Sequence, residues 1–418
     1  MARGDEDRYV PVRVLLLLTS LHGGGAERVA VHLANHSDRA RLDVRIGLLR
    51  GAGPFVKDVA PGRLIVAPEG ERRFVFEGHN SGFYRPDRLL AGAVHAPRAF
   101  RRMIRDFRPD VVMSSLKGTT LITQRALAGL EAARPRWIAR EGNNTLAVID
   151  DELSVPLARR VVAWHTARAY RAADVVLANS HHMAAGLIDD LALDPARLRV
   201  IHNPIDAERA RAEADAPVPR ASDARPFILS VGRLEYQKGH DMLLAGYARS
   251  AARATHDLVI VGRGSREAAL RREADSLGIA GQVTFVGFED NPWGWMARAA
   301  LVVLPSRWEG FPTTAGEALA LGRPMLVTDC RFGSRELVGH DEAGWCVPPD
   351  VAGLRGGIDR LIGDPALAAR LGAQGPARVA AFAMAPMVAG YGALFEELAA
   401  ANRAAPPALS GSTSAARS

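Results

Sequence analysis

Short apolar runs alternate with helix-length amphipathic stretches along the whole chain. Parallel strands need crossover helices between them, so this alternation predicts an α/β protein with two parallel sheets, each covered by helices. The runs that predict strands are residues 12–20, 42–49, 110–115, 136–140, 174–180 and 197–204, then 225–233, 257–264, 282–288, 300–306 and 324–330.

The composition changes at residues 212–226, which are acidic and then rich in proline. Such a stretch is typical of a linker, and a chain of 418 residues is long enough for two cores. We therefore expect two Rossmann-like domains that face a cleft. The remaining boundaries are a polar end at 1–11, a first domain at 12–211, a second domain at 227–386, a helix at 387–403 that packs back on the first domain, and a disordered tail at 404–418.

The run at residues 12–21, VRVLLLLTSL, has the apolar character of a signal sequence. Acidic residues at positions 5–7 precede it, so we interpret it as a buried first strand. No other apolar run approaches the ~20 residues of a membrane helix. The two cysteines, Cys330 and Cys346, indicate neither a disulfide framework nor a zinc site. We expect a cytoplasmic protein without a metal or a cofactor.

The net charge of +7 suits nucleic acid, an anionic lipid surface or anionic small molecules, and charge alone does not choose among them. Most basic residues are arginines, and the lysines are Lys57, Lys117 and Lys238.

Residues 97–110 predict an amphipathic helix whose apolar face carries Phe100, Met103, Ile104 and Phe107. Its arginines lead to two interpretations: a surface helix that covers the first sheet, or, together with Arg72 and Arg73, a contact with anionic lipid head groups or a lipid-diphosphate acceptor. The arginines are Arg98, Arg101, Arg102, Arg105 and Arg108.

The stretch RWEGFPTTAGEALALGRP, residues 307–324, carries two acids in different settings. Pro312 and Thr313 predict a helix start, so Glu309 lies in the loop before the helix and Glu317 about one turn into it. A helix amino end suits a phosphate. However, Thr314 and Glu317 also have the spacing of a capping box.

A basic pair follows another predicted strand. Arg233 and Lys238 form either a solvated surface or a clamp for a diphosphate, because an arginine fork and a compact ammonium both bind phosphate oxygens. Glycines that follow strands, Gly23, Gly24 and Gly25 and then Gly262 and Gly264, let the backbone approach a ligand closely.

Several of these stretches together resemble a known family over about residues 12–400. GGGAERV, NPID, VGRLEYQKG, VGRGSREAAL, VLPSRWEGFP, the two glutamates with seven residues between them, and EALALGRPMLVTDC are similar to family 4 of the retaining glycosyltransferases, which have the GT-B fold. TDCRFGSREL is similar to the members that build bacterial lipopolysaccharide, capsule and lipid-linked glycans.

The resemblance implies a nucleotide diphosphate sugar as donor, with UDP favoured over GDP, and a role for each matching residue. Arg233 and Lys238 would grip the diphosphate, Glu309 the sugar, and Glu317 the ribose hydroxyls. The other implied donor-side residues are Gly262, Gly264, Gly310, Phe311, Pro312 and Thr313. The implied acceptor or reaction-centre side comprises Gly23, Gly24, Gly25, Arg140, Glu141, Asn143 and Asn203.

One departure from the family concerns the histidine that many members carry near the reaction centre. This chain has RWIAREGNNT there, so the role of that histidine is not carried over. His22, beside the glycines, is either a substitute or an ordinary loop residue.

The resemblance therefore implies a retaining, metal-independent glycosyltransferase that transfers to a hydroxyl of a glycan or lipid-linked acceptor. We expect a cytoplasmic enzyme with a peripheral contact to the inner face of the membrane, and no nucleic-acid partner. Two alternatives stay open at this point: a noncatalytic binder of an anionic polymer, and a nucleotide-sugar epimerase, which would need no acceptor.

Overall fold

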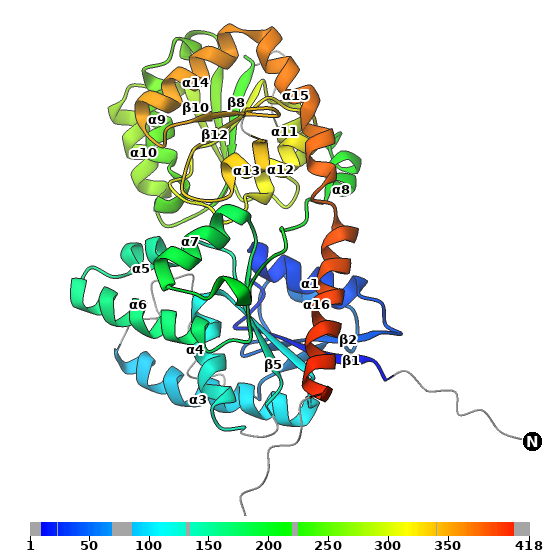
Figure 1. The fold of residues 1–418 in the computed structure, drawn as a ribbon. Helices are drawn as coiled ribbons and strands as arrows, with labels where there is room; N and C mark the ends of the chain where they lie inside the picture. The colour runs from blue at the N-terminus through cyan, green and yellow to red at the C-terminus, as the bar shows by residue number, and fades with distance from the viewer. Residues whose placement is uncertain are drawn as a thin grey trace, which may run out of the picture. The chain divides into compact units, whose positions relative to one another are not determined.

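The computed structural model describes residues 10–22, 24–68, 86–130, 134–219, 225–339 and 341–404, and its two sheets confirm the predicted α/β class (Figure 1). The first sheet has the strand order β3-β2-β1-β4-β5-β6-β7 and the second the order β10-β9-β8-β11-β12-β13. The strand pairs β1–β2, β1–β4, β4–β5, β8–β9, β8–β11 and β11–β12 are all parallel.

All predicted strands form. The strands are β1 (Val12–Leu18), β2 (Leu42–Leu48), β3 (Leu64–Val66), β4 (Val111–Ser115), β5 (Arg136–Glu141), β6 (Val175–Ala178) and β7 (Leu198–Val200), then β8 (Phe227–Val231), β9 (Asp257–Val261), β10 (Val283–Gly287), β11 (Leu301–Leu304), β12 (Met325–Thr328) and β13 (Trp345–Val347). The prediction missed β3 and β13, which are three residues long each.

Helices connect the strands. They are α1 (Gly25–His36), α3 (Pro86–Phe107), α4 (Leu116–Leu127), α5 (Thr145–Glu152), α6 (Pro156–Arg171), α7 (His181–Leu191), α8 (Ala207–Ala212), α9 (His240–Ala248), α10 (Glu267–Ser276), α11 (Trp293–Arg298), α12 (Thr313–Ala320), α13 (Ser334–Val338), α14 (Val351–Gly363), α15 (Pro365–Ala380) and α16 (Met384–Ala404). Short 3-10 turns are η1 (Pro54–Asp58), η3 (Pro195–Arg197), η4 (Tyr236–Lys238), η5 (Ala251–Ala254) and η6 (Ala280–Gln282).

The chain divides into two compact units. The first takes the described residues of Met1–Arg140, Trp164–Val176 and Val388–Ser418, and the second those of Glu141–Ala163 and Leu177–Met387. Within the first unit, α16 is tied by an ion pair between Arg41 and Glu396 and by one between Arg403 and Asp110.

The strands of the second unit are apolar at successive positions, without alternation of apolar and polar residues, because both faces of their sheet are covered. Leu229 and Val259 belong to a core on one face of the sheet, whereas Ile228 and Leu258 belong to a second core on the other face. A parallel sheet with both faces covered must be apolar at successive positions. Successive positions along these strands are therefore apolar.

One helical stretch of the described residues, Pro365–Arg403, is long and apolar enough to cross a membrane by length and composition. The expectation that no apolar stretch besides residues 12–21 approaches that length does not hold for it. Core helices pass the same test, and Leu371, Val379, Tyr391 and Phe395 of this stretch are buried.

Candidate active site

Lys238 and Glu309 form the centre of the site. Lys238 ends η4, after β8, and Glu309 lies in the loop after β11, the strand beside β8 in the sheet. The lysine Nζ lies 2.5 Å from Oε1 of Glu309, and the Ser306 hydroxyl donates to the same oxygen at 2.6 Å. Two residues from separate sequence motifs are thus in direct contact.

Arg233 is connected to this pair through a residue that the sequence analysis did not single out. Arg233 donates to Oε1 of Gln237 at 3.3 Å, while Nε2 of Gln237 donates to the Trp308 carbonyl at 3.0 Å and to Oδ1 of Asn143 at 3.4 Å. Gln237 is buried. Its position beside Lys238, in η4, was the sequence signal for it.

Two glycines at the strand ends are required by close backbone approaches. Gly262 has a φ of +143°, and a Cβ there would lie 1.9 Å from the carbonyl oxygen of Gly232. A Cβ on Gly310 would lie 2.0 Å from the carbonyl oxygen of Gly142. Side chains at either position would push the loops apart.

The segment after β5 lies against the loop that contains Gly310, within the second unit. Oε1 of Glu141 accepts from the backbone N–H groups of Gly142 and Asn143 at 2.8 and 3.0 Å, and Oε2 accepts from the Thr145 hydroxyl at 2.9 Å. Glu141 is buried and shapes the turn. The predicted residues Glu141 and Asn143 are thus brought together with Gly310 and Gln237.

Glu317 lies in α12, and the capping-box interpretation of it is wrong. The helix begins at Thr313 after Pro312, with no side-chain cap, so Glu317 is its fifth residue rather than its third. Pro312 takes the N-cap position with φ −80° and ψ 92°, so the helix begins two residues earlier than a Thr314 cap would allow. Glu317 is 5% exposed, so this carboxylate is held inside the protein by contacts other than a cap.

The remaining predicted donor residues surround the start of α12. Phe311 and Pro312 are buried, Thr313 is half-buried, and the Ser180 hydroxyl donates to the Gly310 carbonyl at 3.1 Å. Gly264 faces the carbonyl oxygen of Leu234, which a Cβ would approach to 2.4 Å.

The residues predicted for the acceptor or reaction-centre side are divided between the units. Gly24 caps α1 and Gly25 begins it, both in the first unit, while Gly23 lies outside the described residues. Arg140, also of the first unit, is 1% exposed and donates from Nε to the Tyr391 hydroxyl at 2.8 Å. Asn203 is buried in the second unit. Their roles toward an acceptor stay predictions.

His22 is exposed, and its Nδ1 lies 2.8 Å from the Ser20 hydroxyl. This local contact within one loop fits an ordinary loop residue as well as a substitute base. The sequence-based alternative therefore stays open.

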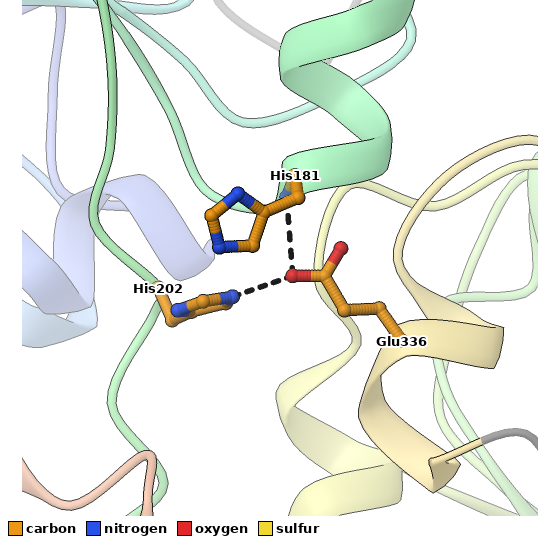
Figure 2. A group of neighbouring side chains, drawn as sticks. All are labelled: His181, His202 and Glu336. Atoms are coloured by element: carbon orange, nitrogen blue, oxygen red, sulfur yellow. Dashed lines mark hydrogen bonds and ion pairs between the residues drawn. The ribbon is translucent and has the colours of Figure 1, made fainter.

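A histidine and glutamate cluster, which the sequence analysis missed, joins three segments of the second unit (Figure 2). Oε1 of Glu336, in α13, lies 2.6 Å from Nε2 of His202 and accepts from the backbone N–H of His181 at 3.1 Å, while Oε2 accepts from that of His182 at 3.1 Å. Burial opposes ionisation of Glu336, but these hydrogen bonds outweigh it and hold its pKa at about 2. The cluster is anionic at Glu336 at neutral pH.

The amphipathic helix predicted at residues 97–110 forms as the second half of α3. Phe100, Met103, Ile104 and Phe107 are buried as predicted. Arg101 donates to the carbonyls of Arg125 and Ala126, so it packs on α4. The exposed arginines of this helix are Arg98, Arg102 and Arg105. The helix ends at Phe107 rather than at residue 110, and the exposed Arg108 follows it with a φ of +50°. Arg72 and Arg73 lie outside the described residues.

A second exposed helix face was not anticipated from the sequence. Along α6, Leu157 is 71% exposed, Val161 47% and Trp164 57%. These positions are four and three residues apart, so they share one face of the helix. Arg160, Arg168 and Arg171 are exposed on the same helix. An apolar stripe flanked by arginines faces outward here.

The family models match both halves of the chain. The model for Glycosyltransferase Family 4 matches residues 23–209, and the model for Glycosyl transferases group 1 matches residues 212–378.

Curated relatives share part of the chain. An N-acetylgalactosaminyltransferase of Campylobacter jejuni, named for N,N'-diacetylbacillosaminyl-diphospho-undecaprenol, is 33% identical over 181 residues, 43% of this chain and 48% of the relative. The lipopolysaccharide core mannosyltransferase LpsB of Rhizobium meliloti is 31% identical over 192 residues, 43% of this chain and 52% of LpsB. The chain thus spans about half the length of these relatives.

Solved structures share the fold over nearly the whole chain. The structure of Anabaena HepE in complex with UDP-glucose superposes with a TM-score of 0.73 at 19% identity, over 92% of this chain and 99% of HepE. At this identity the likeness shows the fold alone. The likeness to HepE and the two parallel sheets show the GT-B fold. The two family models adjoin and together span nearly all of residues 23–378, so the chain belongs to the family 4 glycosyltransferases.

Proposed function

We propose that this glycosyltransferase moves a sugar from a nucleotide diphosphate donor, UDP in preference to GDP, to a hydroxyl of a glycan or lipid-linked acceptor. The observation that carries the proposal is the contact between Lys238 and Glu309. Arg233 is linked to the same loop, because it bonds Gln237, which in turn bonds the carbonyl of Trp308, the residue before Glu309. Two cations and an acid are thereby held at the carboxyl ends of adjacent parallel strands, where ligands of such sheets bind.

The two cations, Arg233 and Lys238, would stabilise the diphosphate leaving group. Breaking the bond between the sugar and the phosphate leaves negative charge on the diphosphate, and fixed positive charge there lowers the barrier. An ammonium has three donors, so Lys238 can hold Glu309 and still donate to phosphate oxygens. The amino end of α12, which begins at Thr313, supplies further N–H groups for a phosphate.

The two acids, Glu309 and Glu317, would bind opposite ends of the donor, the sugar and the ribose. Lys238 and Ser306 fix the carboxylate of Glu309, and we propose that it accepts hydrogen bonds from sugar hydroxyls. We propose that Glu317, five residues beyond Pro312 in α12, accepts from the ribose hydroxyls, as the family resemblance implies. In this arrangement the diphosphate lies between them. Charge on the diphosphate is met by protein cations, so we propose that transfer needs no metal ion. We also propose that it retains the anomeric configuration, as the family resemblance implies.

The proposal for the acceptor depends on the name of a relative and on an exposed apolar helix face. The Campylobacter jejuni relative is named for a sugar on diphospho-undecaprenol, and the second helix face described above suits a lipid surface. We propose a lipid-linked acceptor, reached at the cytoplasmic face of a membrane. Leu157, Val161 and Trp164 of α6 would enter the interface, and the exposed arginines of the same helix would meet anionic head groups. The exposed arginines at α3 are a separate proposed contact with anionic lipid.

Product analysis tests the proposed reaction. The protein is incubated with UDP-sugars and GDP-sugars, with and without an undecaprenyl-diphosphate-linked sugar, and nucleoside diphosphate release and the new anomeric signal are followed by NMR. We expect release that depends on the acceptor and a product with the donor's configuration. A product of inverted configuration would overturn retention. An epimerised donor in the absence of acceptor would overturn transfer in favour of an epimerase.

A further inference from the structure

We propose that His181, His202 and Glu336 form a binding site for a divalent transition-metal ion of the Zn²⁺ class. The proposal is independent of the sugar-transfer reaction, because none of the three residues is assigned a part in it. The three side chains come from the start of α7, the loop after β7 and the short helix α13 (Figure 2).

The ligand atoms already lie together. One nitrogen of each histidine and one carboxylate oxygen of Glu336 all lie within 4.8 Å of one another. The rings of His181 and His202 meet edge to face with centroids 5.5 Å apart. Figure 2 shows Glu336 joined to the ring of His202 and to the backbone N–H of His181. Two ligands of a tetrahedral zinc ion lie about 3.3 Å apart when each is about 2.0 Å from the metal. The cluster therefore needs shifts of roughly an ångström rather than a rearrangement.

Two of the ligands are fixed in place before any ion arrives. The His202 ring packs against Phe311 at 5.1 Å and Phe382 at 5.0 Å between centroids, and this contact keeps its Nε2 directed at Glu336. The Glu336 carboxylate is held by the backbone N–H groups of His181 and His182. Such outer contacts orient metal ligands in known sites.

The ligand types select the metal. Two imidazoles and one carboxylate are a frequent zinc set, whereas Mg²⁺ and Ca²⁺ prefer oxygen ligands alone. Nε2 of His202 and Oε1 of Glu336 lie 2.6 Å apart, a distance that requires one proton between them. An ion that binds both atoms takes the place of that proton, which leaves to solvent.

The open side of the cluster can complete the coordination. His181 is exposed, so its ring can adjust and water can reach the ion. Nδ1 of His182 lies 3.9 Å from Oε2 of Glu336 and is a further nitrogen within reach.

The place of the cluster indicates what a bound ion would do. Ser180, which precedes His181, donates to the Gly310 carbonyl, and Gly333, which precedes α13, would bring a Cβ within 2.1 Å of the same carbonyl oxygen. Phe311 packs on His202. An ion would thus clamp three segments that support the loop of Gly310 and Phe311, with an effect on stability.

The test is calorimetric titration of the metal-stripped, tag-free protein with ZnCl₂, with thermal unfolding with and without ZnCl₂. We expect one bound ion per cluster and a raised midpoint of unfolding. His181→Ala removes an exposed ring and keeps the backbone N–H, so the fold should persist while the affinity falls at least about tenfold. Glu336→Gln retains an acceptor for the α7 amides and should weaken binding similarly.

His36→Ala is the matched control, because His32 and His36 form a pair on α1 that could also hold an ion. Affinity lost in His36→Ala and kept in His181→Ala would assign the ion to α1 and overturn the proposal. The proposal would also be overturned if zinc gave no heat and no stabilisation with the wild type, or if both effects were unchanged in His181→Ala. Replacing Zn²⁺ by Co²⁺ gives a second readout, since visible bands of a tetrahedral ion should appear in the wild type and vanish in His181→Ala.

Discussion

The ammonium nitrogen of Lys238 lies 2.5 Å from a carboxylate oxygen of Glu309, and both side chains are largely buried. If this cation stabilises the departing diphosphate, its loss should act on the chemical step. We expect Lys238→Ala to lower kcat by about 10²–10³-fold at saturating donor, and Arg233→Ala to act in the same direction. Steady-state kinetics with a donor that the wild type accepts makes the measurement.

Lys57→Ala is the control for the loss of a lysine, because Lys57 is exposed in η1, outside the second unit. It should leave kcat unchanged, and far-ultraviolet circular dichroism should show that all variants are folded. A folded Lys238→Ala enzyme with near-normal kcat would contradict the proposed diphosphate role.

The sequence predicted the fold well because parallel sheets covered on both faces leave long apolar runs. It missed β3 and β13, whose three residues each form strands only through pairing with β2 and β12. Such short segments have no local pattern of their own, so their structure depends on neighbours that are distant in the sequence.

The site was predictable where its residues follow strands. Arg233, Lys238 and Glu309 follow β8 and β11, which are adjacent, so their convergence follows from topology. The capping-box interpretation of Glu317 was wrong because α12 begins at Thr313, directly after Pro312, and not after Thr314. The cluster of His181, His202 and Glu336 joins residues up to 155 positions apart, which no local pattern connects.

Membrane contact should depend on the apolar stripe of α6. We expect the triple variant Leu157→Ser, Val161→Ser and Trp164→Ala to reduce binding to anionic vesicles several-fold, because it removes the side chains that enter the interface. Cosedimentation with vesicles that contain phosphatidylglycerol, compared with neutral vesicles, measures this. Binding of the wild type should also fall as salt rises.

The matched variant for charge alone is Arg98→Ser with Arg102→Ser and Arg105→Ser, which leaves the buried face of α3 intact. It should reduce the preference for anionic lipid but not remove apolar insertion. Equal binding of wild type and the α6 triple variant to all vesicles would leave α6 as a plain surface helix.

His240 should make the protein less stable in mild acid. Burial lowers the pKa of this imidazole to about 3, and the charge of Lys238 adds to the effect. The unfolded chain takes up a proton near pH 6.5, whereas the folded form resists, so this group costs stability as pH falls below about 6.5. By pH 5 the cost is roughly 2 kcal/mol.

His240→Leu removes the titrating group without adding a polar one. Denaturant unfolding at pH 7.5 and pH 5 should show a smaller loss between the two pH values for this variant than for the wild type. His22→Leu, at an exposed position, should show the same loss as the wild type. A His240→Leu protein with an unchanged pH dependence would mean that His240 accepts a proton in the fold.

Glu317 offers the sharpest test of the donor arrangement, because the cap that competed with the ribose role is absent. A carboxylate accepts from both ribose hydroxyls, while an amide has one acceptor oxygen and turns a donor toward the second hydroxyl. Glu317→Gln keeps the size of the buried side chain, so the midpoint of unfolding should change little. Binding of UDP should weaken by roughly 1.5–3 kcal/mol, an order of magnitude or more.

The 2'-deoxy form of UDP separates a ribose contact from a general loss of negative charge. If Glu317 bonds the ribose, the penalty of Glu317→Gln should be clearly smaller for 2'-deoxy-UDP than for UDP, because one of the two hydroxyls is already missing. Calorimetry on the wild type and the variant with both nucleotides completes the cycle. An equal penalty for the two nucleotides would place Glu317 away from the 2'-hydroxyl, and no penalty for either would remove it from the donor site altogether.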